Sequence, residues 1–177
     1  MTEITWREVK RVDVNMTPGA LWRLALEYVQ GPRLLRLRVL NSKGEPVLNG
    51  EPGLNKDGKA KVDPAGKVDW PTWGLADSIC SPDGNPRNPP KDTLLLCSRA
   101  PQGALIGKLG GSSADHPDTA PNSQPYGTRK VFAVGTYCVI AVAKDDSGPL
   151  FLTRNETLDA FNADMGHLNV LIEEASA

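Results

Sequence analysis

Five side chains that carry oxygen ligands occupy one short segment near the end of the chain. They are Asn155, Glu156, Asp159, Asn162 and Asp164. Carboxylate and amide oxygens bind hard cations such as Ca²⁺, and the same groups hydrogen-bond the hydroxyls of a polyol. Acidic and amide residues are also ordinary residues of solvated loops. The composition therefore leaves two interpretations open: a solvated loop, and a site for a cation or a sugar.

Two apolar runs flank this polar segment, at 150–152 and 168–172. Short apolar runs bounded by turn residues are typical of β-strands. We expect the two runs to pair with each other, with the polar segment and Gly166 between them.

Two other segments come close to catalytic or phosphate-binding motifs, and neither fits. The segment 103–109 has the glycines and the lysine of a phosphate-binding loop, but it is one residue short, and Leu109 stands where a Mg²⁺-binding Ser or Thr is required. We interpret it as a strand whose glycines allow close packing. Ser112, Asp115 and His116 are neighbours in one loop, whereas the members of a catalytic triad converge from separate parts of a fold. We therefore expect a protein that binds rather than one that catalyses.

Length and charge limit the class of protein. The 177 residues suffice for one domain, 1–177, with a hydrophobic core. A net charge of -1 gives no field that would attract nucleic acid or an anionic membrane. No apolar run approaches the ~20 residues that span a bilayer, and the beginning of the chain lacks the apolar region of a Sec-type signal peptide. We expect a soluble protein without membrane insertion, cytoplasmic or exported by another route.

The three cysteines, Cys80, Cys97 and Cys138, are an odd number without close spacing, which argues against a disulfide framework or a zinc site. Cys97 and Cys138 lie in apolar runs, where a free cysteine behaves as a small buried hydrophobe. A disulfide between Cys97 and Cys138 is the alternative, and it requires that their two strands are neighbours.

Alternation and turn signals predict many short strands. Beyond the closing segment, the expected strands are 4–14 (with a bulge), 34–40, 94–97, 104–111, 131–134 and 136–143. The segment 20–29 is ambiguous, because Pro18 and Gly31 favour a helix whereas the spacing of Trp22 and Leu24 favours a strand. The 17 glycines and 15 prolines are consistent with many turns between short strands. The pattern predicts an all-β sandwich of the jelly-roll type, with a short helix near 18–30 as the open alternative.

Several spaced residues between Trp70 and Ile172 form a further pattern. They are Cys97 with Gly103, Ala104 and Leu105; Phe132 with Gly135; and Phe161, Asp164, Gly166, Leu168, Val170 and Ile172. This pattern resembles the LecA (PA-IL) family of bacterial galactose-binding lectins, with the best resemblance over 70–172. The resemblance implies a small β-sandwich that binds galactose through a calcium ion held between two loops.

Transferred position by position, the resemblance implies a set of calcium ligands. They are the backbone carbonyls of Trp73 and Ala160 and the side chains of Glu156 and Asp164. A further asparagine ligand of the family falls on Ala163, which has no side-chain oxygen. Asp159 or Asn162 could replace that ligand only along a different loop path.

The resemblance also implies a sugar site. The ring of Trp70 or Trp73 would stack on the C–H face of the sugar, and the polar contacts would come from Asp92, Asn155, Asp159 and Asn162. A histidine and a glutamine that contact sugar in the family fall near Pro90 and Thr93, so those contacts are missing here. The sequence thus predicts a lectin-like, galactose-type carbohydrate-binding protein with calcium as cofactor and a glycan as partner, and it allows a homo-oligomer. The alternative is a non-catalytic structural or assembly module that has lost the sugar site.

Overall fold

Alternating apolar and polar side chains are the local cause of the strands, because successive side chains of a strand point to opposite faces. The computed structural model describes residues 4–15, 21–41, 43–47, 73–75, 78–84, 95–113, 130–157 and 166–176. The strands are β1 Thr5–Asn15, β2 Arg23–Gln30, β3 Arg33–Leu40, β4 Trp73–Leu75, β5 Ser78–Cys80, β6 Leu105–Leu109, β7 Lys130–Ala133, β8 Tyr137–Val142, β9 Ser147–Arg154 and β10 His167–Ser176. These segments contain no helix, and hence none that could cross a membrane.

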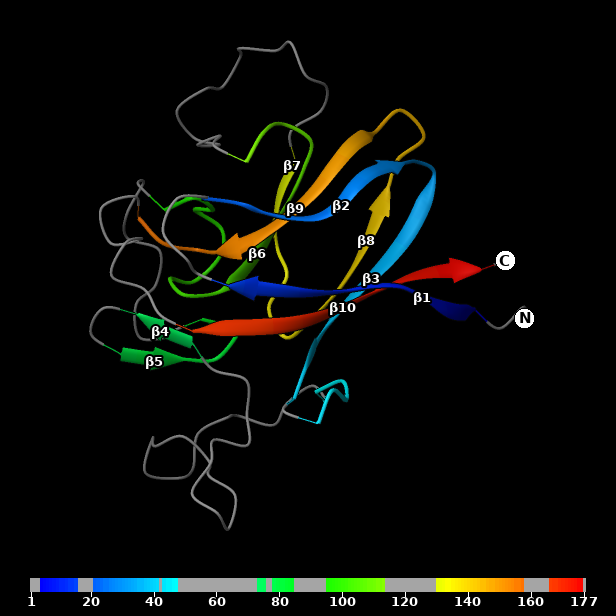
Figure 1. Ribbon diagram of the computed structural model, residues 1–177. Coiled ribbons are helices and arrows are strands. Elements are labelled where there is room, and N and C mark those ends of the chain that lie inside the picture. The colour runs from blue at the N-terminus through cyan, green and yellow to red at the C-terminus, as the bar shows by residue number, and fades with distance from the viewer. Residues whose placement is uncertain are drawn as a thin grey trace.

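Eight of these strands form two antiparallel sheets (Figure 1). The first sheet has the order β1-β10-β3-β8, the second has the order β2-β9-β6-β7, and β4 and β5 form a separate hairpin. Apart from β6 and β7, strands of the large sheets that follow one another in the chain lie in opposite sheets. This winding is that of a jelly roll. The predicted all-β sandwich of the jelly-roll type is confirmed.

The expected pairing of the two closing strands is wrong. β9 pairs with β2 and β6, whereas β10 pairs with β1 and β3. The segment between them therefore crosses from one sheet to the other and is no hairpin loop. The reason is the jelly-roll winding, which the two apolar runs do not encode.

The structure also decides two predictions of secondary structure, those for the segments 20–29 and 94–97. The ambiguous segment is a strand over Arg23–Gln30, so the helix alternative is wrong for these residues. Leu95 to Cys97, by contrast, were expected to form a strand, yet they lie in an irregular buried segment. The side chains of Leu96 and Cys97 are apolar because they cover the outer face of the second sheet.

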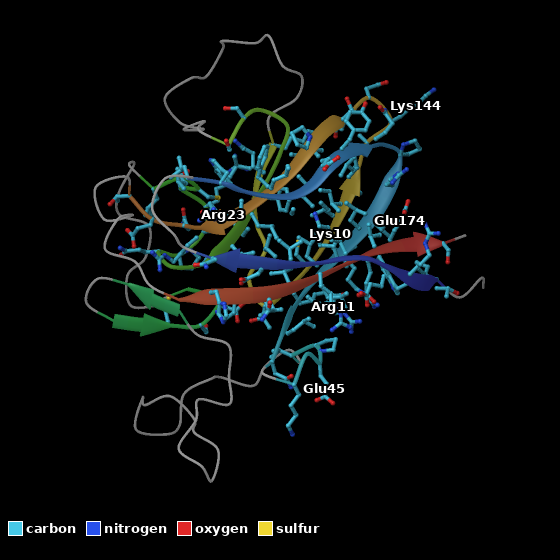
Figure 2. All side chains as sticks on the ribbon, in the orientation of Figure 1. Lys10, Arg11, Arg23, Glu45, Lys144 and Glu174 are labelled. Carbon is cyan, nitrogen blue, oxygen red and sulfur yellow. The ribbon has the colours of Figure 1, made fainter. Side chains whose placement is uncertain are left out.

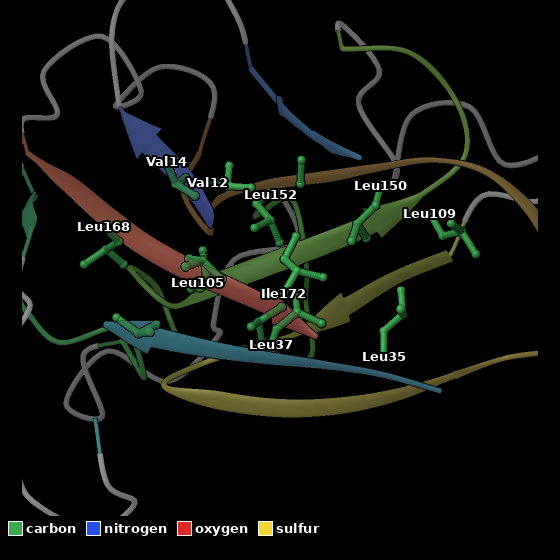
Figure 3. Close-up of a cluster of buried hydrophobic side chains, with 14 of the residues drawn as sticks. Val12, Val14, Leu35, Leu37, Leu105, Leu109, Leu150, Leu152, Leu168 and Ile172 are labelled. Carbon is green, nitrogen blue, oxygen red and sulfur yellow. The ribbon is translucent and has the colours of Figure 1, made fainter. Parts of the chain in front are cut away.

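The main core lies between the two sheets. Every second residue of β3 points into it, namely Leu35, Leu37 and Val39. Figure 3 shows Leu35 and Leu37 with side chains from the neighbouring strands β1 and β10 and from the strands β6 and β9 of the facing sheet: Val12, Val14, Leu168, Ile172, Leu105, Leu109, Leu150 and Leu152. Burial of this apolar surface, at roughly 25 cal/mol per Å², is the main stabilising force of the sandwich.

A second apolar layer covers the outer face of the second sheet. It consists of Trp22, Leu96, Cys97, Ala100, Ala104, Ile106 and Phe151. Lys108 is also buried here, with its Nζ 4.7 Å from the ring centre of Trp22 and 4.8 Å from that of Phe151. The irregular segment 95–104 thus takes the place of a further sheet layer on this face.

Close packing across β6 explains its central glycine. A Cβ atom on Gly107 would lie 2.5 Å from the ring of Phe132 on β7, so the aromatic ring fills the space above the glycine. This confirms the strand interpretation for Leu105–Leu109 and the role of Gly107, whereas Gly103 lies in the turn before the strand.

The outer face of the first sheet carries charges. Glu173 on β10 accepts bidentate hydrogen bonds from Arg36 and Arg38 on β3, at 2.7 to 2.9 Å. The ring of Trp6 lies 4.4 Å from the guanidinium carbon of Arg36. The exposed side chains labelled in Figure 2, such as Arg11, Glu45 and Lys144, likewise lie at the periphery of the molecule.

The three cysteines are free thiols, as the sequence indicates. Cys80 and Cys97 are buried, and Cys138 is partly buried on β8. Cys97 belongs to the layer outside the second sheet, whereas Cys138 packs against the core between the sheets. The disulfide between them is therefore not formed.

Candidate binding site at the end of β9

The polar segment singled out in the sequence begins where β9 ends. Arg154 is the last residue of β9 and faces Leu105, the first residue of β6. His167, the first residue of β10, faces Asn15, the last residue of β1. The hairpin β4–β5 lies at the same end of the sandwich (Figure 1). This end therefore gathers segments that are far apart in the sequence.

Asn155 holds one of these segments in place. Its side chain is 0% exposed. Its Nδ2 donates to the carbonyl oxygens of Cys97, Ala100 and Pro101 at 2.9, 2.8 and 3.1 Å, and its Oδ1 accepts the N–H of Cys97 at 2.8 Å. The amide thus satisfies buried backbone groups of an irregular segment that has no strand partner to do so.

The backbone of Asn155 strengthens the same attachment. Its N–H donates to the carbonyl of Ala104 at 2.8 Å, and its carbonyl accepts the N–H of Gly103 at 2.7 Å. The segment 97–104 is consequently fixed to the end of β9 by both the side chain and the main chain of one residue.

Glu156 comes next and is also buried, with 1% of its surface exposed. Its Oε1 accepts hydrogen bonds from Nε2 of Gln102 at 2.8 Å and from the N–H of Thr157 at 2.9 Å. The other oxygen, Oε2, accepts no hydrogen bond from any residue that the structure describes. The Glu156 carboxylate is therefore engaged with the fixed segment through Oε1 and is almost wholly shielded from solvent.

Arg154 places a positive charge beside this carboxylate. Its side chain is fully buried, and burial lowers the pKa of Arg154 to about 10, against the opposing effect of the nearby Glu156 and Cys80 groups. A pKa of about 10 leaves the guanidinium charged at neutral pH. The end of β9 thus contains its own cation next to the Glu156 carboxylate.

The described residues do not fit a calcium ion. Calcium takes six to eight oxygen ligands, and no three Asp, Glu, His or Cys side chains within the described segments lie together as a metal site. Glu156 is the one predicted side-chain ligand among them, and a calcium ion at its carboxylate would meet the charge of Arg154. Ala160, Ala163 and Asp164 lie outside the described residues.

The structure places few of the predicted sugar contacts. The backbone of Trp73 opens β4 and pairs with Cys80, and Asn155 is placed as above. Asp92, Asp159 and Asn162 lie outside the described residues. All hydrogen-bonding groups of the Asn155 amide hold the main chain, so Asn155 shapes the site, and its direct contact with a sugar stays a prediction.

Two residues of this cluster were missed by sequence reasoning. Gln102 reaches Glu156 across 54 positions of the chain, and no local pattern signals such a contact. Arg154 follows the apolar run by two positions, and nothing in the local pattern marks it as buried, because arginine side chains are mostly exposed.

Comparisons with known proteins add no relative. A scan of the sequence against models of protein families finds no match, and a search of curated proteins finds none either.

Proposed function

We propose that this protein is a non-catalytic carbohydrate-binding β-sandwich that takes a galactose-type glycan at the end of β9. The observation that carries the proposal is the crossover from β9 to β10, which starts at the fixed pair Asn155 and Glu156. The resemblance to the galactose-binding lectins concerns the same segment, and those lectins are β-sandwiches too.

A fixed starting point favours sugar binding for a physical reason. Sugars bind through many hydrogen bonds, each of modest net strength, so a site that must first order its own loop loses much of the gain. At the end of β9, six hydrogen bonds of Asn155 already order the adjoining segment. A glycan would therefore meet one side of the site, the segment 97–104, already fixed before binding.

The proposed contacts are of two kinds, hydrogen bonds to the sugar hydroxyls and stacking against the C–H face of the ring. Hydroxyl groups of the sugar would hydrogen-bond the carboxylates of Asp92 and Asp159 and the amide of Asn162. The C–H face of galactose would stack on Trp73. Because the described residues do not fit calcium, no contact in this proposal runs through the ion.

Thermal unfolding tests the proposal, with galactose, with glucose as a control sugar, and with calcium or EDTA. A ligand that binds only the folded state stabilises it by RT ln(1 + [L]/Kd). At about ten times Kd this is about 1.4 kcal/mol, which raises the Tm by about 3–6 °C for a chain of this size. A galactose-specific rise supports the proposal, and no response to any sugar contradicts it. If galactose raises the Tm only when calcium is present, the calcium site that the resemblance implies would be supported.

A matched pair of variants locates the response. Asp159→Ala removes a proposed sugar contact of the crossover segment, and Asp145→Ala removes an exposed acid on the β8–β9 turn at the other end of β9. The galactose response should fall in the first variant and stay in the second. Equal responses would place the sugar elsewhere.

A second candidate is an assembly module, and one observation favours it. Tyr137 and Val139 on β8 are exposed by 41% and 40%. In the register of the first sheet they stand beside Arg38 and Arg36, on a face that no described segment covers. An exposed face of aromatic, aliphatic and arginine side chains has the composition of an interface core.

The occupant we propose for this face is a second copy of the chain. Light scattering after size exclusion should then show a dimer that Val139→Glu dissociates. Tyr28→Glu is the control, because Tyr28 is 62% exposed on β2 of the other sheet. A monomer at all concentrations would remove this candidate.

A further inference from the structure

A groove opens between the two sheets along the edge formed by β7 and β8. β7 is the last strand of the second sheet, and β8 is the last strand of the first. The groove has a volume of about 460 Å³, within the range of roughly 300–1,000 Å³ that is usual for small-molecule sites. Its lining consists of Leu109, Lys130, Val131, Phe132, Ile140, Ala141, Val142 and Asp146.

The floor of the groove is apolar. Phe132 and Ile140 pack against the main core but stay partly exposed, because no further strand follows β7 or β8 at this edge within the described segments. Leu109 and Val142 are buried beneath them. Apolar surface left open in this way gains free energy when a ligand removes it from water.

One end of the groove is charged. Lys130 lies two residues before Phe132 on β7 and so shares its face, which points between the sheets. Its Nζ forms an ion pair with Asp146, in the turn between β8 and β9. This pair closes the end of the groove across the two sheets.

The two partners of the pair are not equally accessible. The side chain of Asp146 is 9% exposed, and its Oδ2 also accepts the N–H of Ala143 at 3.2 Å. The side chain of Lys130 is 52% exposed, and its ammonium group has three donors, one of which is directed at Asp146. Lys144, labelled in Figure 2, is exposed on the same turn. Asp145 is exposed beside it in the chain, and the two charges offset each other. The member of the pair that a ligand in the groove can reach is therefore the lysine, because the Asp146 carboxylate is shielded from solvent.

We propose that this groove binds a small amphipathic anion, a free carboxylate with an unbranched apolar chain. The chain would lie between the sheet edges over Phe132 and Ile140, and the carboxylate would accept hydrogen bonds from Lys130. The site is separate from the proposed glycan site. Asp146 directly precedes β9, whereas Glu156 follows it, and eight strand residues span roughly 25 Å.

Amide chemical shifts of ¹⁵N-labelled protein test the proposal, with sodium decanoate and decyltrimethylammonium, both below micelle formation. The two probes share the apolar chain and differ in the sign of the head group. Decanoate should shift the amides of Phe132, Ile140 and Val142 and bind at least about tenfold more tightly than the cation, the effect of one charged hydrogen bond. Shifts elsewhere, or equal affinity for both probes, would overturn the proposal.

Variants separate the charge from the groove itself. Lys130→Gln should weaken decanoate about tenfold and leave the cation unchanged or tighter, whereas Lys144→Gln, on the exposed turn, should change neither. Ile140→Trp should fill the groove and weaken both probes. If Lys130→Gln weakens both probes alike, the lysine acts on the structure and not on the head group, and the assignment of an anion fails. Wild-type shift mapping remains decisive even if Ile140→Trp does not fold.

Discussion

Asn155 and Cys97 are joined by two hydrogen bonds at once: the N–H of Cys97 donates to Oδ1 of Asn155 at 2.8 Å, and Nδ2 of Asn155 donates to the carbonyl of Cys97 at 2.9 Å. Both residues are buried. The side-chain amide thus pairs with a backbone unit as a neighbouring strand would, and it does so where the chain has no strand.

The first prediction concerns this pair. Asn155→Ala leaves buried backbone groups of Cys97, Ala100 and Pro101 without their partner, and each such group costs about 1–3 kcal/mol. We expect a total loss of at least about 2 kcal/mol in the free energy of unfolding, measured by urea denaturation. The control is Asn169→Ala, since Asn169 is exposed on β10, and it should change stability by less than about 0.5 kcal/mol. A neutral Asn155→Ala would show that the segment 97–104 does not depend on the amide.

The second prediction concerns the packing of β6 against β7. Gly107→Ala places a methyl group 2.5 Å from the ring of Phe132, and overpacking of this kind costs about 1–3 kcal/mol. In the double variant with Phe132→Leu, the smaller side chain should recover part of this loss. A double-mutant cycle on unfolding free energies measures the coupling, and additive effects would contradict direct contact between the two positions.

The third prediction is a pH dependence at Glu173. Burial by itself would raise the pKa of Glu173, but the hydrogen bonds from Arg36 and Arg38 outweigh it and hold that pKa below 4.5. A carboxylate whose pKa is depressed in the folded state contributes stability above its unfolded pKa, and loses it as the pH falls through the folded pKa.

Glu173→Gln should therefore destabilise the protein by about 1–3 kcal/mol at pH 7, in line with the loss of charged hydrogen bonds. The difference from wild type should shrink as the pH falls from the ordinary pKa of a glutamate through the lower pKa of folded Glu173. Unfolding by urea at pH 7, 5 and 3 measures it. Glu27→Gln, at an exposed site on β2, serves as the control, and a difference that is constant across this range would speak against the ion pairs.

The fourth prediction concerns the thiols. All three cysteines are free, so the denatured protein should release three equivalents from a disulfide reagent such as dithiobis(nitrobenzoate). In the native protein Cys138 should react first, because Cys80 and Cys97 are buried. Burial raises the pKa of Cys138 above 9.0, so its reaction should be slow at pH 7.5 and accelerate as the pH rises toward that pKa. Cys138→Ser should remove this phase, and fewer than three thiols would reveal a disulfide.

The polar segment after β9 could be found from sequence, but its role could not be fully derived. A cluster of carboxylates and amides between two apolar runs marks a candidate site by composition alone. Whether each group faces a ligand or the protein depends on what the rest of the chain brings to it. Asn155 is engaged by the backbone of 97–101, and Glu156 by Gln102, and both partners are more than 50 positions away in the chain.

The sequence by itself determined the elements whose cause is local. Alternation fixed the strand over Arg33–Leu40 and the bulged strand over Thr5–Asn15, because the two faces of a strand meet different surroundings. Only the tertiary structure decided which strands pair and what the apolar run at Leu95 to Cys97 does. Pairing of β9 and β10 with different sheets follows from the jelly-roll winding, and the burial of the run follows from the outer face of the second sheet that it covers. Apolar residues record that a segment is buried, and only the assembled chain determines against which surface.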